Sequence, residues 1–148
     1  MNPNETVREV LRVKGNRAWS ISPSATVFEA IRLMAEKNVG ALLVTDGEKL
    51  VGIISERDYT RKVALKGKAS KDTAVREILS DHIISVTPDN TVEECMRLMT
   101  DHRVRHLPVL EAGTIMGVIS IGDLVNSIIS AQRTTIQQLQ TYISGVPA

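Results

Sequence analysis

The chain contains two copies of one unit, and this repeat constrains its fold more than any other feature. When residues 20–63 are aligned with residues 85–128 without a gap, fifteen of the 44 positions are identical. A second match lies upstream, where Val7–Leu11 resembles Val75–Leu79. An open solenoid needs at least three repeats. We therefore expect two small related units that pack face to face around a pseudo-twofold axis.

Both copies predict the order helix, strand, helix, strand, strand, helix. In the first copy the expected segments are Val7–Leu11, Trp19–Ser22, a helix capped by Thr26, Ala41–Thr45, Leu50–Ser55 and a helix from Glu56. In the second copy they are Val75–Leu79, Ile83–Thr87, a helix capped by Thr91, Leu107–Leu110, Thr114–Ser120 and a helix from Ile121. The fold class is α/β (α+β), with two pseudo-twofold-related repeats that each hold a small sheet with flanking helices. We place the repeats at residues 7–67 and 75–130, with a linker at 68–74 and a C-terminal helical tail at 131–148.

The central helix of each copy is expected to begin with a capping box. Thr26 is followed three residues later by Glu29, and Thr91 by Glu94. At this spacing the hydroxyl and the carboxylate can satisfy free backbone N–H groups at the start of a helix. Apolar residues then recur at spacings of three and four, as an amphipathic helix requires. Cys95 falls on this apolar face, so we interpret it as a small core residue and not as a nucleophile.

Composition narrows the classes of function. The 148 residues carry a formal net charge of +1 and 3% aromatic residues. This argues against a nucleic-acid binder, which needs massed positive charge and stacking surfaces. The single cysteine excludes an intramolecular disulfide, and the three histidines lack the spacing of a metal site. Because no apolar run approaches the ~18 residues of a membrane span and no secretory signal is recognisable, we expect a cytoplasmic protein without membrane contact.

The sharpest local motif is Gly-Ile-Ile-Ser-Glu-Arg-Asp at residues 52–58, which returns as Gly-Val-Ile-Ser-Ile-Gly-Asp at residues 117–123. In each Gly–Ser–Asp motif a strand ends at the serine, a helix begins, and the aspartate lies three residues into the motif's helix. The serine and the aspartate can form a further capping box. The same geometry suits a nucleotide, because a carboxylate accepts hydrogen bonds from ribose hydroxyls and a helix N-terminus attracts phosphate. From the residues alone both interpretations stay open.

Two arginines and two histidines gather at a predicted turn between helix and strand, His102-Arg103-Val104-Arg105-His106-Leu107-Pro108. Pro108 disfavours helical geometry at the residue before it, so the helix must end earlier. The cluster is either a solvated basic turn or a phosphate-binding turn, for which the planar guanidinium is suited. The corresponding residues 37–44 of the first copy are nearly uncharged. A third basic group follows the first Gly–Ser–Asp motif and consists of Arg57, Arg61 and Lys62.

Together these motifs resemble a tandem pair of CBS domains, the cystathionine-β-synthase-type repeat that forms a Bateman module. The resemblance extends from about Val7 to Ile128. It rests on both Gly–Ser–Asp motifs, on the Val-x-Glu openings of the central helices and on Arg-His-Leu-Pro-Val at residues 105–109. The chain is similar to stand-alone prokaryotic CBS-pair proteins. The family implies a disc-shaped homodimer that holds AMP, ADP, ATP, NAD(H) or S-adenosylmethionine in clefts between the repeats.

The resemblance also assigns roles to individual residues, carried over by motif. Ribose hydroxyls would be held by Asp58 and Asp123, and ribose or phosphate would be contacted by Ser55 and Ser120. The adenine slot would be lined by Ser20, Ile21, Ala41, Ser85, Val86, His106 and Leu107. The phosphate partners would be Arg57, Arg103 and Arg105. Because Gly122 replaces Arg57, and Gly40-Ala41 replaces Arg105-His106, either one site is weaker or each takes basic residues from the other repeat.

Three hypotheses about function remain. The first is a non-enzymatic sensor of an adenine nucleotide, without a catalytic cofactor, that changes conformation or association on binding and so alters a protein target. The second is a ligand-independent dimerisation module with vestigial clefts. The third is an enzyme that acts on a nucleotide or a redox substrate. We disfavour the enzyme because no nucleophile or metal set can be placed and both the P-loop and the Gly-x-Gly-x-x-Gly motifs are missing from the sequence.

Overall fold

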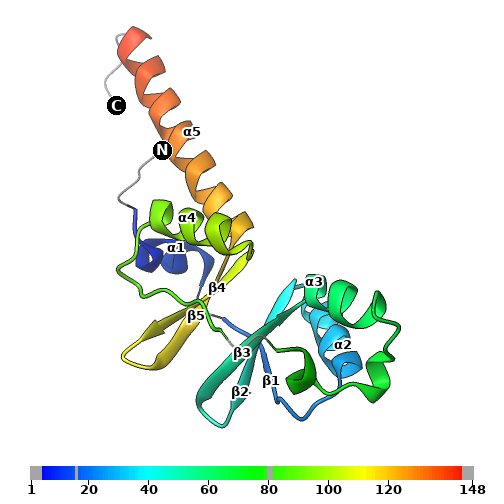
Figure 1. The fold of residues 1–148 in the computed structure, drawn as a ribbon. Coiled ribbons are helices and arrows are strands. Elements are labelled where there is room, and N and C mark those ends of the chain that lie inside the picture. The colour runs from blue at the N-terminus through cyan, green and yellow to red at the C-terminus, as the bar shows by residue number, and fades with distance from the viewer. Residues whose placement is uncertain (1–4, 16, 80–81, 145–148) are drawn as a thin grey trace. The chain divides into compact units, whose positions relative to one another are not determined.

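The computed structural model describes residues 5–15, 17–79 and 82–144, which fall into two compact units (Figure 1). Unit 1 comprises the described parts of Met1–Asn16, Val86–Glu111 and Met116–Ala148. Unit 2 comprises those of Arg17–Ser85 and Ala112–Ile115. Two small sheets with flanking helices confirm the predicted fold class.

Unit 2 is built on a three-stranded sheet in the order β1-β2-β3. Strand β1 (Ser20–Ile21) runs parallel to β2 (Ala41–Asp46), and β2 runs antiparallel to β3 (Lys49–Ser55). A two-residue turn joins β2 to β3, and its Gly47 has a φ of +63° that favours glycine. The helical segments are α2 (Val27–Lys37), α3 (Glu56–Asp58), η1 (Tyr59–Ala64), η2 (Ser70–Asp72) and η3 (Val75–Ile78).

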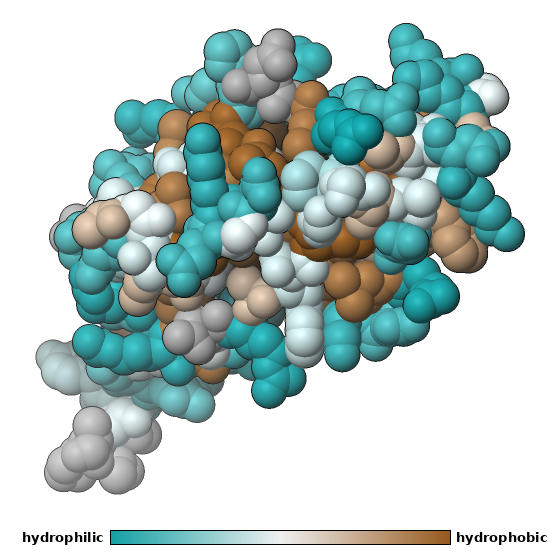
Figure 2. Space-filling model, turned by 90° about the horizontal axis from the view of Figure 1, so that it is seen from below, coloured by the Kyte–Doolittle hydropathy of each residue, from teal (hydrophilic) through white to brown (hydrophobic). Residues whose placement is uncertain are grey.

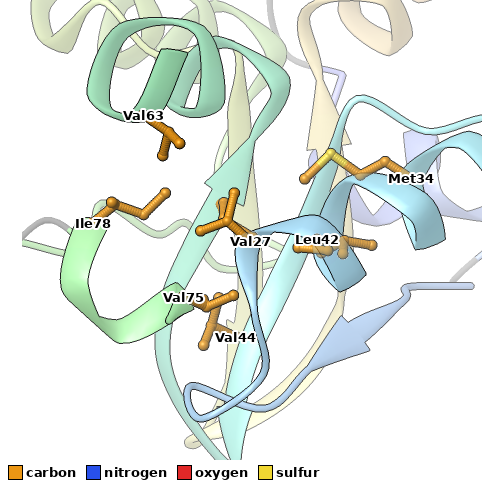
Figure 3. Close-up of a cluster of buried hydrophobic side chains, with 9 residues drawn as sticks. Val27, Met34, Leu42, Val44, Val63, Val75 and Ile78 are labelled. Atoms are coloured by element: carbon orange, nitrogen blue, oxygen red, sulfur yellow. The ribbon is translucent and has the colours of Figure 1, made fainter. Parts of the chain in front are cut away.

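The core of unit 2 lies between the sheet and α2 (Figure 3). Leu42 and Val44 alternate on one face of β2, and both have no exposed surface. Ile54 of β3 is equally buried. One stripe of α2 packs against them at the predicted spacings of three and four, namely Val27, Ala30 and Met34. Each large apolar side chain buried in this way stabilises the fold by about 1.5–3 kcal/mol.

Unit 1 repeats this design with longer helices. It contains α1 (Val7–Lys14), α4 (Val92–His102), β4 (His106–Glu111) and α5 (Ile121–Ser144). Strand β5 (Thr114–Ser120) pairs with β4, and its residues from Met116 onward belong to unit 1. The core side chains of unit 1 with no exposed surface are Val7, Cys95, Leu107, Val109, Ile119 and Leu124. Cys95 is thus confirmed as a core residue, and burial raises the pKa of its thiol to about 11. The thiol therefore stays protonated and unreactive at neutral pH.

The opening segment of each sequence repeat packs on the body of the other copy. In unit 1 the Val7 N–H donates to the Asn90 carbonyl at 2.8 Å, and the Val92 N–H donates to the Glu5 carbonyl at 2.8 Å. In unit 2 the same pattern joins Val75 to Ala25 and Val27 to Thr73, also at 2.8 Å. The two compact units therefore do not coincide with the two sequence repeats. The repeat boundaries at 7–67 and 75–130 stay a prediction.

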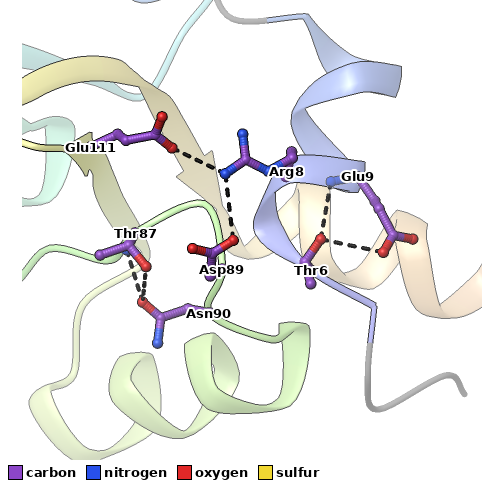
Figure 4. Close-up of polar contacts among 7 residues, drawn as sticks. All are labelled: Thr6, Arg8, Glu9, Thr87, Asp89, Asn90 and Glu111. Atoms are coloured by element: carbon purple, nitrogen blue, oxygen red, sulfur yellow. Dashed lines mark hydrogen bonds and ion pairs between the residues drawn. The ribbon is translucent and has the colours of Figure 1, made fainter.

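Surface ion pairs fasten α1 to the second copy (Figure 4). Arg8 Nη2 lies 3.0 Å from Glu111 Oε2 and 3.4 Å from Asp89 Oδ1. Because all three side chains are largely exposed, each pair contributes at most about 1 kcal/mol. The apolar contacts of Val7 and Val10 and the backbone hydrogen bonds therefore hold α1 in place.

Several predicted elements take another form. The segment Val75–Leu79 is a 3₁₀ helix over Val75–Ile78, because its first N–H groups donate to carbonyls of the loop before α2. Residues 83–87 form no strand beyond a parallel bridge between Val86 and Val109. The Asn90 side chain accepts the Thr87 N–H at 2.8 Å and so removes it from a ladder.

The last helix differs between the copies. In the first copy it is one α-helical turn, α3, continued by the π-helix η1. In the second it runs unbroken through α5, which includes residues 131–144 of the segment 131–148 predicted as a helical tail. The remaining residues, 145–148, lie outside the described residues. Hydrophilic side chains predominate on the face seen in Figure 2, with apolar patches between them. Within the described ranges no helix combines the length and the apolar character that a bilayer span requires.

Both predicted capping boxes at the central helices are present, and that of α4 has a consequence for pH dependence. Hydrogen bonds from the N–H and hydroxyl of Thr91 and from the Asn90 amide lower the pKa of Glu94 below its ordinary 4.5. A depressed pKa means that the carboxylate stabilises the folded state above pH 4.5, and that this is lost as the pH falls through the lower folded value.

We therefore expect Glu94→Gln to be less stable than the parent at neutral pH and to approach it in acid. Urea unfolding of both proteins over a series from neutral to strongly acidic pH measures this difference. A difference that stays constant across the series would show that the charge of Glu94 has no part in it.

Candidate functional site

Both Gly–Ser–Asp motifs lie where a buried strand passes into a helix. Strand β3 ends at Ser55 and α3 follows, while β5 ends at Ser120 and α5 follows. The Ser55 N–H donates to Asp58 Oδ2 at 2.9 Å, and the Asp58 N–H donates to Ser55 Oγ at 3.2 Å. The second copy has the same two bonds between Ser120 and Asp123, at 2.8 and 3.2 Å. The capping-box interpretation is therefore confirmed in both copies.

The capping box occupies one oxygen of each carboxylate. In both aspartates Oδ2 accepts the serine N–H. Oδ1 of Asp58 faces Lys62 Nζ at 3.4 Å. Within residues 5–15, 17–79 and 82–144, no hydrogen bond reaches Oδ1 of Asp123. Capping therefore leaves Oδ1 of Asp123 able to accept a hydrogen bond from a ligand, because an ionised carboxylate has about four acceptor positions.

Each aspartate has a lysine partner. Lys14 Nζ, at the end of α1, donates to Asp123 Oδ2 at 2.7 Å and to the Val118 carbonyl at 2.6 Å. Sequence reasoning missed Lys14, because α1 opens the first repeat, Asp123 lies in the second, and nothing local links the two residues. The pairing of Lys62 with Asp58 did leave a signal, since the two residues have the i, i+4 spacing of a helical ion pair.

The start of a neighbouring strand, β2 in unit 2 and β4 in unit 1, lies beside each Gly–Ser–Asp motif. In unit 2, Ala41 pairs with Ser55, and the Glu56 N–H donates to the Gly40 carbonyl at 3.1 Å. In unit 1, the Ile121 N–H donates to the Arg105 carbonyl at 2.9 Å. This bond joins the basic turn directly to the N-terminus of α5. The turn and the second motif, predicted as separate parts of one site, are therefore brought together.

Within this turn, Arg103 has an unusual backbone conformation. It ends α4 with a φ of +55°, in the left-handed region, as Asn38 does at +54° in the first copy. Asparagine tolerates this region, whereas it costs other residues about 1–2 kcal/mol. The side chains of Arg103 and Arg105 are exposed and that of His106 is half-buried.

The residues assigned to the adenine slot differ in how exposed they are. Ser20 pairs with Leu43 and is exposed, and Ile21 and Ala41 are half-buried. Val86 and Leu107 are buried and offer almost no surface to a ligand. Ser85 is exposed and belongs to unit 2. Arg57, on α3, is half-buried.

The glycine of the first motif makes room for a neighbouring side chain. A Cβ at Gly52 would lie 3.0 Å from Leu79 Cδ2, which is too close for an ordinary contact. Gly52 therefore serves the packing of unit 2, and the chemistry of the motif rests on its serine and aspartate.

Unit 1 also contains a groove of about 670 Å³ between α1 and α5. Lys14 and Asp123 line it, together with Glu9, Val10, Ser127 and Thr134. This volume lies within the roughly 300–1,000 Å³ of small-molecule sites. Among the described residues, no three or more His, Cys, Asp or Glu side chains are placed to hold a metal ion.

Comparison with known proteins gives consistent matches. The model of the CBS domain matches residues 16–65 and 75–130. The mitochondrial CBS domain-containing protein CBSX3 of Arabidopsis thaliana is 39% identical over 150 residues, covering 95% of this chain and 72% of that protein. The CBS domain-containing protein YhcV of Bacillus subtilis is 32% identical over 105 residues, covering 71% and 74%.

Solved structures agree with this assignment. A crystal structure of the CBS domain NE2398 has a TM-score of 0.81 and 50% identity, covering 84% of this chain and 98% of its own. A putative signal-transduction protein with CBS domains from Burkholderia ambifaria has a TM-score of 0.82 and 48% identity, covering 86% and 96%. A hexameric CBS-CP12 protein from bloom-forming cyanobacteria has a TM-score of 0.72 and 32% identity, covering 81% and 69%.

Proposed function

The chain belongs to the CBS-domain family, and we propose that it is a non-catalytic regulatory module that binds an adenine nucleotide. CBS-pair proteins are generally regulatory or signal-transduction modules. The proposed ligand is AMP, ADP, ATP or NAD(H), and its binding changes the conformation or association of the module. The module then acts as a homodimer on a protein target in the cytoplasm, although the Arabidopsis relative is mitochondrial.

The observation that carries the proposal is that the two oxygens of the Asp123 carboxylate have different partners. Oδ2 accepts hydrogen bonds from the Ser120 N–H and from Lys14 Nζ, while Oδ1 has no hydrogen bond from any described residue. The side chain is 18% exposed, so a ligand can reach it. A ribose hydroxyl that donates to Oδ1 would leave the helix cap intact.

The surroundings of Asp123 suit the phosphate end of a nucleotide. The N-terminus of α5 presents the positive end of a 24-residue helix. The N–H groups of Ile121 and Asp123 are already donated there, to the Arg105 carbonyl and to Ser120 Oγ, so attraction of a phosphate rests on the helix dipole and on basic side chains. The basic turn is bonded to that N-terminus through Arg105. Exposed guanidinium groups at Arg103 and Arg105 can bind phosphate oxygens in pairs. The left-handed conformation of Arg103 supports a role in binding, because backbone strain gathers at functional sites.

We infer that the two aspartates differ in affinity. At Asp58, the lysine faces the oxygen that capping leaves available, so a ribose hydroxyl would have to displace Lys62. At Asp123, the lysine shares the capping oxygen, and Oδ1 can accept a hydroxyl while Lys14 stays in place. The Asp123 site is therefore the stronger of the two in this proposal.

A thermal-shift panel tests the proposal against the ligand-independent alternative. The ligands are AMP, ADP, ATP, NAD⁺, NADH and S-adenosylmethionine, each added at millimolar concentration to protein freed of nucleotide. A ligand at about 100 times its dissociation constant adds about 2.7 kcal/mol of stability, which raises the melting temperature clearly. A panel without any shift would favour a dimerisation module with vestigial clefts.

A further inference from the structure

Helix α5 carries a set of large apolar side chains, from Val125 to Ile143, that are exposed. In Figure 1 the helix continues past α1 and α4 of unit 1. The exposed fractions rise along it, from 42% at Val125 and 39% at Ile129 to 54% at Ile136, 56% at Leu139 and 82% at Ile143. An exposed apolar stripe of this kind marks an interaction surface.

The spacing of these side chains is that of a coiled coil. We define the seam as Val125, Ile129, Gln132, Ile136, Leu139 and Ile143, whose spacings alternate between four and three. Isoleucine occupies the three a positions of this heptad pattern. Valine, glutamine and leucine occupy the d positions. In parallel coiled coils, isoleucine at a with leucine at d favours two strands, and Leu139 is the one leucine at a d position of this seam.

The seam faces away from α1, one of the two helices, α1 and α4, that contact α5. Asp123, Ser127, Ser130 and Thr134 line the groove against α1 and follow the same alternation of four and three. Each of them precedes a seam residue by two positions. Because two residues turn a helix by roughly 200°, the seam lies on the side of α5 opposite the α1 groove. Its five apolar side chains are 39–82% exposed with α1 and α4 in place.

We propose that the seam binds the seam of a second copy of this chain, as a parallel, in-register, two-stranded coiled coil. Gln132 identifies the partner and the orientation. In the parallel pair it faces Gln132 of the second copy, and the two amides can donate and accept one hydrogen bond each. In an antiparallel pair over the same seam Gln132 would face Ile136 and be buried unpaired, which is costly.

Charge and length agree with this partner. Between residues 124 and 144 the single charged residue is Arg133, at an e position whose parallel neighbour is Ile128. No like charges therefore oppose each other. The seam covers fewer than three heptads, so we expect an association that depends on protein concentration. The inference does not rest on nucleotide binding.

Cysteine cross-linking tests the proposal on the full chain. Leu139→Cys places a thiol at a d position, where two parallel helices come close enough for a disulfide. Gln138→Cys is the matched control at an outward c position. The native Cys95 does not interfere, because it is buried and its pKa is raised. We expect the Leu139→Cys protein to form a disulfide-linked dimer at least tenfold faster than the control under mild oxidation.

A charged residue placed in the seam provides the second test in the cross-linking experiment. Ile136→Asp, added to Leu139→Cys, is expected to reduce cross-linking to the level of Gln138→Cys, whereas Gln137→Asp is expected to leave it unchanged. Residue 136 is 54% exposed, so unchanged thermal unfolding will show that the variant is folded. Equal rates for Leu139→Cys and Gln138→Cys, or cross-linking that survives Ile136→Asp, would overturn the proposal.

Discussion

Ile54→Ala is expected to lower the free energy of unfolding of unit 2 by about 2–5 kcal/mol. Ile54 has no exposed surface and lies in the cluster formed by the hairpin and α2. Truncation removes its transfer free energy and leaves a cavity between two rigid elements that cannot collapse into it. A loss of this size is a large fraction of the 5–15 kcal/mol of a typical domain, so it is the largest stability effect we expect.

Urea unfolding, monitored by tryptophan fluorescence, measures this loss of stability in unit 2. Trp19 is the single tryptophan and packs against the cluster that contains Ile54. Leu65→Ala is the matched control, because Leu65 is 77% exposed and should change stability by no more than about 0.5 kcal/mol. A loss below 1 kcal/mol, or an equal loss in the control, would contradict the assigned core.

Asp123→Asn is expected to weaken binding of an adenine nucleotide roughly 10- to 100-fold, the largest functional effect we expect. Hydrogen bonds to a charged group contribute about 1.5–3 kcal/mol, which corresponds to this range. Asparagine keeps an Oδ1 that can accept the Ser120 N–H, so the capping box can be retained, whereas the ion pair with Lys14 is lost. The variant should therefore keep the start of α5, and its melting temperature relative to the parent measures the loss of the Lys14 ion pair.

A ligand without ribose hydroxyls separates this role from a general disturbance. The 2′,3′-dideoxy analogue of the same nucleotide should bind the parent and Asp123→Asn with similar affinity, because it cannot donate to the carboxylate. Asp58→Asn should have the smaller effect on the natural nucleotide. If Asp123→Asn binds the natural nucleotide like the parent, the ribose assignment is wrong.

The elements that local signals determine could be predicted from the sequence. The capping boxes at Thr26 and Thr91 follow from a three-residue spacing, and the apolar stripes of α2 and α4 follow from the helical period. The hairpins follow from their turn residues. The Ser55–Asp58 and Ser120–Asp123 pairs were predictable for the same reason, because each depends on neighbours within one helical turn.

The remaining features depend on contacts between distant parts of the chain. The Val75–Ile78 segment is a 3₁₀ helix because its N–H groups donate to the loop before α2, which the local sequence does not contain. Lys14 meets Asp123 because α1 packs on the second copy. Local sequence patterns do not predict contacts between distant residues, so the pairing of Asp123 with Lys14 could be identified only in the structure.

Calorimetric titration of nucleotide-free protein tests the central claim most directly. The titrant is the adenine nucleotide with the largest thermal shift, and the parent is compared with Asp123→Asn and the Asp58→Asn, Asp123→Asn double variant. We expect saturable binding to the parent, weaker binding to the single variant and none to the double variant. Absence of saturable binding to folded parent protein, or equal binding to all three proteins, would contradict it.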